Sequence, residues 1–231
     1  MGTRSSPRRR GAHTATLAGT AAQLVVGCTF LALAATAGLV FVHRPWPNRL
    51  DLWGYAVLPA DTGAHWAHDL VTVGSLTALI VGAVAVFLVG MLRDRVRAVA
   101  CAIAPAVAVL IVQDLAKPLV GRHLGITGAA SYPSGTVAAA AALMTAATLV
   151  VPPLVRPLVA AAGAAVTVGV CAAVIVLRWH FPTDALGGVA VGVGAVLTVD
   201  ALFHAPWALA GAVSAHRSDA RGRPSGRPRL A

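Results

Sequence analysis

Apolar residues run through this chain in long blocks that are separated by short polar loops. Six blocks are long enough to be interpreted as membrane-spanning helices, because a helix needs about 20 apolar residues to cross the hydrocarbon core of a bilayer. The predicted spans cover residues 16–42, 70–92, 98–114, 136–152, 157–177 and 185–207. They are rich in Ala, Gly, Val and Leu, which suits close helix packing in lipid. The pattern predicts an all-α, polytopic membrane protein with about six transmembrane helices.

The chain divides into one membrane domain and a polar segment at each end. We assign residues 1–15 to a basic N-terminal segment, residues 16–207 to a six-helix membrane domain and residues 208–231 to a basic tail. The tail is rich in Arg, Pro, Gly and Ser, so we expect it to be disordered. The first apolar block is long enough to span, and we predict a retained signal anchor rather than a cleaved signal peptide.

Composition supports the membrane interpretation. The chain is 58% hydrophobic and only 11% charged, and its mean hydropathy is +0.78. A net charge of +10 is also typical of nucleic-acid-binding proteins, but here the arginines gather at the termini and in short loops, as membrane topology requires. We therefore expect no nucleic-acid partner.

The arginines predict the orientation of the helices. They gather in four regions that an even number of spans places on one side, which the positive-inside rule makes cytoplasmic. These residues are Arg4, Arg8, Arg9, Arg10, Arg93, Arg95, Arg97, Arg156, Arg217, Arg221, Arg223, Arg227 and Arg229. The other side carries only Arg44, Arg49, Lys117, Arg122 and Arg178. We expect a multi-pass plasma-membrane protein with cytoplasmic termini, and loops 115–135 and 178–184 at its outer face.

Those two loops hold the residues with the clearest chemical pattern. His180 and Asp184 stand four positions apart, which places them on one helix face. The carboxylate can then accept a hydrogen bond from one imidazole nitrogen and leave the other nitrogen free. Earlier in the chain, Lys117 and Arg122 precede the sequence Tyr-Pro-Ser-Gly, which stands at the start of an apolar helix. Cations close to a helix N-terminus suit the binding of phosphate. The two loops predict a phosphate site with a candidate histidine nucleophile.

The order and spacing of these residues resemble a known family. Type 2 phosphatidic acid phosphatases, whose fold is shared by vanadium haloperoxidases, carry the motifs Lys-x6-Arg-Pro, Pro-Ser-Gly-His and Ser-Arg-x5-His-x3-Asp in that order. The resemblance covers about residues 60–207, with the motifs inside 113–188. It implies a six-helix membrane core and a hydrolase that removes phosphate from lipids through a phosphohistidine, with no metal and no cofactor.

Carried over residue by residue, the resemblance assigns roles to five positions. Lys117 matches the cation that holds a phosphoryl oxygen. Ser134 and Gly135 match the loop that binds phosphate oxygens at a helix start. His180 matches the nucleophile, and Asp184 matches the carboxylate that orients the imidazole and balances its charge.

The chain also departs from the motifs. Thr136 stands where the family has the histidine that protonates the leaving oxygen, and general acid catalysis is typically worth about 10²–10⁴ in rate. Leu124 and Gly125 stand in place of Arg-Pro, and Ala173 and Val174 in place of Ser-Arg. The usual acid and two phosphate-binding arginines are thus absent from their expected positions.

Neighbouring residues offer replacements. Arg122 lies two places before the missing arginine of the first motif, and Arg178 lies two places before His180. Either guanidinium can make bidentate contacts to phosphate. His123 is a candidate substitute acid, and a diphosphate leaving group needs less protonation.

The loop at residues 43–69 and one buried acid remain. The aromatic residues of this loop suit the membrane interface, and the loop is placed to cap the site. His65, His68 and Asp69 have the composition of a metal cluster, but no further ligand set is visible, so we expect no metal. Asp200, within the last predicted span, has no assigned role.

Two functions from different classes fit these features. The first is a phosphatase acting on phosphatidic acid, phosphatidylglycerophosphate or polyprenyl diphosphate, and the sequence does not choose among these lipids. The second is a catalytically silent relative that binds lipid phosphates or a partner protein. A transporter fits less well because the polar residues cluster at one face. The oligomeric state is not predicted.

Overall fold

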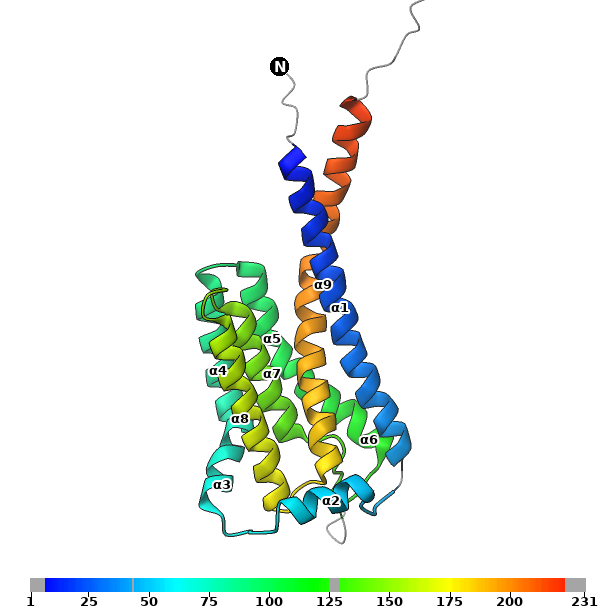
Figure 1. Cartoon of the computed structure of the whole chain (residues 1–231), viewed down its shortest axis with the longest axis vertical. Helices are drawn as coiled ribbons and strands as arrows, with labels where there is room; N and C mark the ends of the chain where they lie inside the picture. Colours follow the sequence, from blue (N-terminus) through cyan, green and yellow to red (C-terminus); the bar gives the residue numbers. More distant parts are fainter. Residues whose placement is uncertain (1–6, 43, 125–128, 223–231) are drawn as a thin grey trace, which may run out of the picture.

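The computed structural model describes residues 7–42, 44–124 and 129–222, and every regular element in these ranges is a helix (Figure 1). The helices are α1 (Pro7–Phe41), α2 (Arg49–Val57), α3 (His65–Val71), the 3-10 turn η1 (Thr72–Gly74), α4 (Leu76–Met91), α5 (Arg95–Leu110), the π-helical turn η2 (Ile111–Ala116), α6 (Lys117–Val120), α7 (Gly135–Val150), α8 (Arg156–Val176) and α9 (Pro182–Gly222). The all-α prediction is confirmed for this part of the chain.

The expected number of about six spans is not confirmed. Four segments of the described chain are long and apolar enough to cross a membrane, namely Leu17–Phe41, Arg95–Val120, Arg156–Val176 and Pro182–Ala210. A fifth is possible only if η1 and α4 form one span with α3, across a bend of 53°. Helix α7 has 16 residues, or about 24 Å of helix, which is shorter than the hydrocarbon core.

Helix α7 is the centre of the bundle. It packs against α4, α5, α8 and α9, and all its residues from 137 to 143 are buried. A helix that is apolar on all sides and covered by protein is a core element. Helix α7 is therefore a core element whose neighbours in the bundle cover it.

Helices α1 and α9 lie side by side and extend beyond the other helices at one end of the molecule (Figure 1). Both ends of the described chain lie there. Because α9 runs to Gly222, residues 208–222 of the tail that we expected to be disordered are helical. Residues 1–6 and 223–231 lie outside the described residues.

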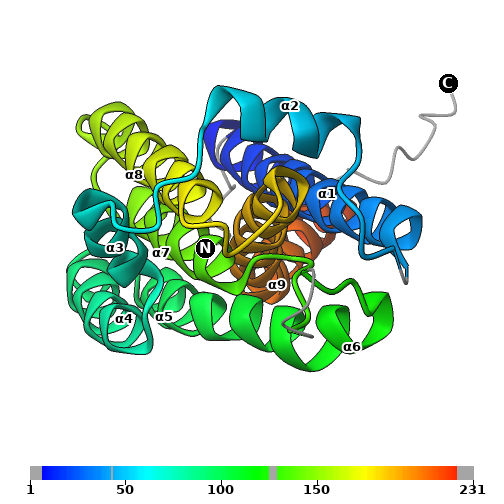
Figure 2. The ribbon, with the colours of Figure 1, turned by 90° about the horizontal axis from the view of Figure 1, so that it is seen from below.

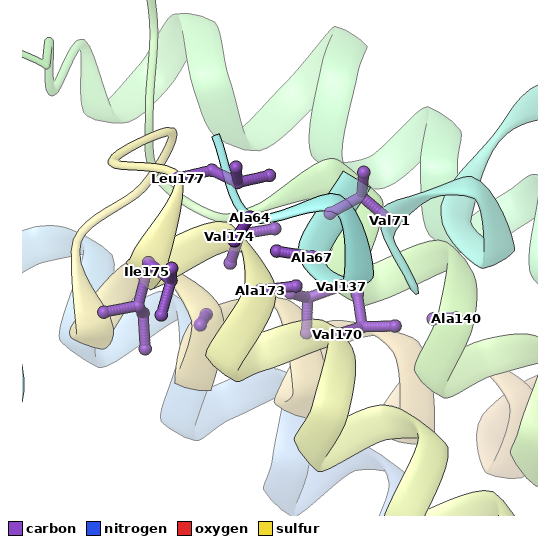
Figure 3. Close-up of a cluster of buried hydrophobic side chains, with 12 residues drawn as sticks. Ala64, Ala67, Val71, Val137, Ala140, Val170, Ala173, Val174, Ile175 and Leu177 are labelled. Carbon is purple, nitrogen blue, oxygen red and sulfur yellow. The ribbon is translucent and has the colours of Figure 1, made fainter. Parts of the chain in front are cut away.

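A cluster of buried apolar side chains fixes the other end (Figure 3). It joins α3, the first turns of α7 and the last turns of α8, and Leu177 closes it at the end of α8. The cluster thereby positions the start of the loop that contains His180.

Helix α2, within the 43–69 loop, lies across this same end of the bundle (Figure 2). Its first turn is a capping box, in which the Asn48 side chain accepts the N–H of Asp51 and the Asp51 side chain accepts the N–H of Asn48. A β-carbon at Gly54 would lie 2.6 Å from Pro182. Only a glycine therefore lets α2 pack directly on the start of α9.

The close approach of α1 and α9 depends on small residues. A β-carbon at Gly27 would lie 2.5 Å from the hydroxyl oxygen of Thr198 and 2.8 Å from its backbone nitrogen, whereas one at Gly19 would meet nothing within 4 Å. Adding a methyl group to a packed interface costs about 1–3 kcal/mol. We predict that Gly27→Ala lowers the free energy of unfolding in detergent by that amount.

Gly19→Ala is the matched control, because it adds the same methyl group to the same helix. We expect it to leave stability unchanged or to raise it slightly, since Ala favours helix over Gly. Equal unfolding curves for the two variants would show that the α1–α9 contact is looser than described.

Candidate active site

Hydrogen bonds and close packing bring the two motif loops together where α9 begins. The backbone N–H of Ser134 donates to the carbonyl oxygen of Asp184 over 2.9 Å. A β-carbon at Gly188 would lie 2.6 Å from the carbonyl oxygen of Ser134. One at Gly187 would lie 2.6 Å from the ring of Tyr132. These glycines let two loops that are far apart in the sequence form one site.

The predicted histidine and carboxylate meet at the start of α9. Nδ1 of His180 lies 3.9 Å from Oδ2 of Asp184, and Nδ1 is buried without a hydrogen-bond partner. The same carboxylate oxygen accepts the backbone N–H of Phe181 over 3.1 Å, which caps α9. A separation of 3.9 Å is longer than a hydrogen bond. The two side chains are therefore neighbours, but their hydrogen bond is not formed.

Arg122 occupies the interior of the site. Its Nη1 donates to Oδ1 of Asp184 over 2.7 Å and to the hydroxyl of Thr183 over 2.8 Å. Its Nη2 donates to Oδ2 of Asp51 over 2.7 Å. All three charged side chains are fully buried. We call Asp51, Arg122 and Asp184 the buried triad.

Aromatic rings cover both faces of the same guanidinium. Its central carbon lies 4.3 Å from the ring centre of Phe41 and 4.2 Å from that of Phe181. We expected Arg122 to bind phosphate, but the structure turns it inward, where carboxylates and rings surround it. Its direct effect is on Asp184, one oxygen of which it holds.

Asp51 is the site residue that sequence reasoning missed. Its Oδ1 accepts both the N–H and the hydroxyl of Thr183, over 2.9 and 2.8 Å. The only signal in the sequence was the pattern Asn48-x-x-Asp51, which is typical of a helix start. That pattern predicts a local cap and contains nothing about a partner more than a hundred residues away.

Arg178 lies at the edge of the site in a left-handed backbone conformation, with φ of 57°. Its guanidinium stacks on the ring of Tyr55, 3.8 Å from the ring centre. Its Nη2 lies 3.5 Å from the carbonyl oxygen of Tyr55. Nη1 is buried and has no hydrogen-bond partner. Arg178, two residues before His180, therefore keeps an unused donor.

Two neutral tyrosine hydroxyls stabilise the site by donating hydrogen bonds to backbone carbonyl oxygens. Tyr55 donates to the carbonyl oxygen of His180 over 3.3 Å, and Tyr132 donates to that of Ala34 over 2.6 Å. Burial raises the pKa of each hydroxyl to about 12. Both groups therefore stay protonated at neutral pH and keep these bonds.

The predicted phosphate loop lies at the start of α7. The Ser134 hydroxyl is buried and caps the helix by accepting the N–H of Val137 over 3.4 Å. Gly135 is the first residue of the helix, and a β-carbon there would lie 2.8 Å from the amide nitrogen of Gln113. Lys117 is half-buried nearby and interacts electrostatically with Asp184.

Comparison with known proteins covers the motif residues from Lys117 to Asp184. Residues 114–208 match the family model described as the PAP2 superfamily. This part of the chain is similar to the PAP2 superfamily. The resemblance to type 2 phosphatidic acid phosphatases is thereby confirmed, and at this coarse level it supports a phosphatase-type hydrolase with membrane helices. No match to the chain was found among curated proteins or among solved structures.

Two of the departures from the PAP2 motifs have a structural account. Ala173 and Val174, which replace Ser-Arg, are fully buried in the apolar cluster of Figure 3. A long cationic side chain at this place would have to leave the cluster. Leu124 is tied to the loop backbone by donating its N–H to Ala129 over 3.3 Å. Gly125 lies outside the described residues.

The candidate acids are placed differently. Thr136 is half-buried at the start of α7, and a β-carbon at Gly74 would collide with its backbone and its methyl group. His123 is exposed, and its backbone forms a β-bridge with Ala130. The structure therefore places His123 at the surface of the loop, beside the buried Arg122.

An apolar groove runs up to the PAP2 motif loop. It has a volume of about 400 Å³ and lies between α1 on one side and η2 and α6 on the other. Tyr132 and Pro133, next to Ser134, close one end of it. Aliphatic side chains, including Leu39, Leu115 and Leu119, make up most of its walls.

The buried triad generates a stability prediction. Arg122→Met keeps most of the side-chain volume but leaves two buried carboxylates without their cation. Removing one partner of a buried ion pair costs about 3–5 kcal/mol. We expect this loss in the free energy of unfolding, measured by denaturant titration in detergent.

Arg49→Met is the control, since Arg49 is exposed on α2 at the same end of the bundle. Its expected change is below about 0.5 kcal/mol, as for ordinary surface substitutions. A loss below about 1 kcal/mol for Arg122→Met would contradict the buried triad.

Proposed function

We propose that this protein is a metal-independent membrane phosphatase that removes phosphate from a lipid phosphate or a prenyl diphosphate through a phosphohistidine. The observation that carries the proposal is the meeting of His180 with Asp184 beside the Ser134 loop. A nucleophile, its carboxylate and a phosphate-binding helix start then stand together.

In the proposed reaction His180 attacks phosphorus through Nε2. The phosphorus–nitrogen bond forms as the bond to the leaving oxygen breaks, and water later cleaves the phosphohistidine. Nδ1 faces Asp184, so the carboxylate balances the positive charge that develops on the ring. Closing 3.9 Å to hydrogen-bond distance needs only a small movement of the ring.

Phosphate oxygens would be held by groups that still have donors to offer. The Ser134 hydroxyl accepts a backbone N–H and keeps its own hydrogen for a ligand. The N–H groups at Gly135 and the ammonium of Lys117 supply positive potential. Arg178 has a buried Nη1 without a partner. In this proposal Arg122 positions Asp184 and does not touch the phosphate.

The apolar groove supports a lipid substrate. It adjoins Pro133 and has almost no polar lining, as the alkyl chain of a membrane lipid requires. Phosphatidic acid, phosphatidylglycerophosphate and polyprenyl diphosphate all combine such a chain with a terminal phosphate.

An outward-facing site in the plasma membrane completes the proposal. The first residues of α1 and the last residues of α9 lie at one end of the bundle, and the motif loops lie at the other (Figure 1). The arginine-bearing turns between α4 and α5 and between α7 and α8 belong to the first end, and by the positive-inside rule we assign that end to the cytoplasm.

A catalytically silent relative is the second candidate function. It is favoured by Thr136 in place of the acid, by Val174 in the apolar cluster and by the open distance between His180 and Asp184. Such a protein would bind a lipid phosphate, or a partner protein, without cleaving a bond.

Phosphate release by purified protein in detergent with EDTA tests the two functions. The panel holds phosphatidic acid, phosphatidylglycerophosphate and a polyprenyl diphosphate. We expect release that disappears in His180→Ala and persists in His65→Ala, which removes an exposed histidine from the same end. Binding without release from any lipid would select the silent relative, and release that survives His180→Ala would refute the phosphohistidine route.

Thr136→His tests the missing acid. A histidine in this place can protonate the leaving oxygen, and we expect phosphate release from a monoester to rise by about 10²-fold, at the lower end of general acid catalysis. The matched control is the double variant with His180→Ala, which should stay inactive. If the rate does not change, an acid at residue 136 is not what limits the reaction, and His123→Ala then tests the substitute.

A further inference from the structure

A polar cavity lies at the end of the bundle opposite the candidate active site. It has a volume of about 200 Å³. It is formed where the turn between α4 and α5 meets the turn between α7 and α8, at the upper left of Figure 1. Its polar walls come from Arg93, Asp94, Arg97 and Arg156. We call it the arginine cavity.

The single carboxylate in the wall is already occupied. Oδ1 of Asp94 accepts the backbone N–H groups of Val96 and Arg97, over 3.0 and 3.1 Å, and caps α5. Oδ2 pairs with Nε2 of His204 over 3.1 Å. Although burial opposes it, these bonds hold the pKa of Asp94 below its usual value. Asp94 is therefore charged at neutral pH, but none of its short contacts is to an arginine side chain of the cavity.

The three guanidinium groups have N–H donors that the protein leaves available. Arg97 uses Nε for an ion pair with Asp200, over 3.2 Å. Arg156 has a buried Nε without a partner, and its Nη2 reaches two backbone carbonyls only at 3.5 Å. Arg93 is exposed at the rim. Positive charge is thus in excess around a small hollow.

We propose that the arginine cavity binds a phosphate group, carried by an anionic lipid or free in solution. Guanidinium forks match the tetrahedral oxygens of phosphate and bind them through paired hydrogen bonds. The volume is below the range of drug-sized ligand pockets and suits one small anion. Basic pockets at the ends of membrane helices are also where lipid headgroups lie. The site is separate from the active site, and the proposal does not depend on catalysis.

Native mass spectrometry of the purified full-length protein tests the proposal. The probes are dioctanoyl phosphatidylglycerol, dioctanoyl phosphatidylcholine as the zwitterionic comparison, and inorganic phosphate. The test variant is Arg93→Gln with Arg156→Gln, which spares Arg97 because that residue is paired with Asp200. The matched control is Arg95→Gln, which removes an exposed charge from the same turn but not from the cavity.

We expect the wild type and Arg95→Gln to hold one more phosphatidylglycerol than the double variant, whose affinity at that site falls about tenfold or more. Binding of phosphatidylglycerol at other sites is the same in all three proteins, so it does not affect the comparison. Retention of phosphatidylglycerol alone identifies a lipid headgroup, and equal retention of inorganic phosphate identifies a free anion. Equal occupancy in the double variant and Arg95→Gln would overturn the proposal, with the melting temperature of each variant without ligand confirming that it is folded.

Discussion

A buried guanidinium group organises the functional end of this protein. Arg122 joins Asp51 on α2 to Asp184 on α9, and each of the three charges is fully removed from water. An ion in such a place is tolerated only if its partners stay close. The start of α9, the cap formed by α2 and the loop after α6 therefore hold one another in place. This arrangement also positions His180, which lies just before the start of α9.

The same interaction helps to explain why the site departs from the PAP2 motifs. Arg122 donates to Asp184 and Asp51, and the positions of the missing Ser-Arg pair are filled by Ala173 and Val174 in the apolar cluster. Part of the positive charge that the PAP2 motifs aim at a phosphate is here used within the protein or replaced by packing. In the proposed function, Lys117, Arg178 and the start of α7 remain as the cations and dipoles available to a substrate.

The sequence predicted the helices and the family but not the internal contacts. Each predicted apolar block is helical over most of its length, although block 70–92 is divided among α3, η1 and α4, since hydropathy reports length and burial directly. It does not report a bend such as the one at Ser75, or that α7 would be too short to count as a span. Spacing within the motifs placed His180 beside Asp184. It could not show which way Arg122 points, because that depends on Asp51, whose distance along the chain hides the contact.

The order in which the charges are synthesised matters for assembly. Asp51 leaves the ribosome first, Arg122 follows, and Asp184 comes only with the last helix. Until then Arg122 has one carboxylate in a place built for two, and Phe181, which covers one of its faces, is also absent. The site is therefore completed only by its C-terminal helix, and a chain that stops before α9 leaves Arg122 with a single carboxylate and without the ring of Phe181.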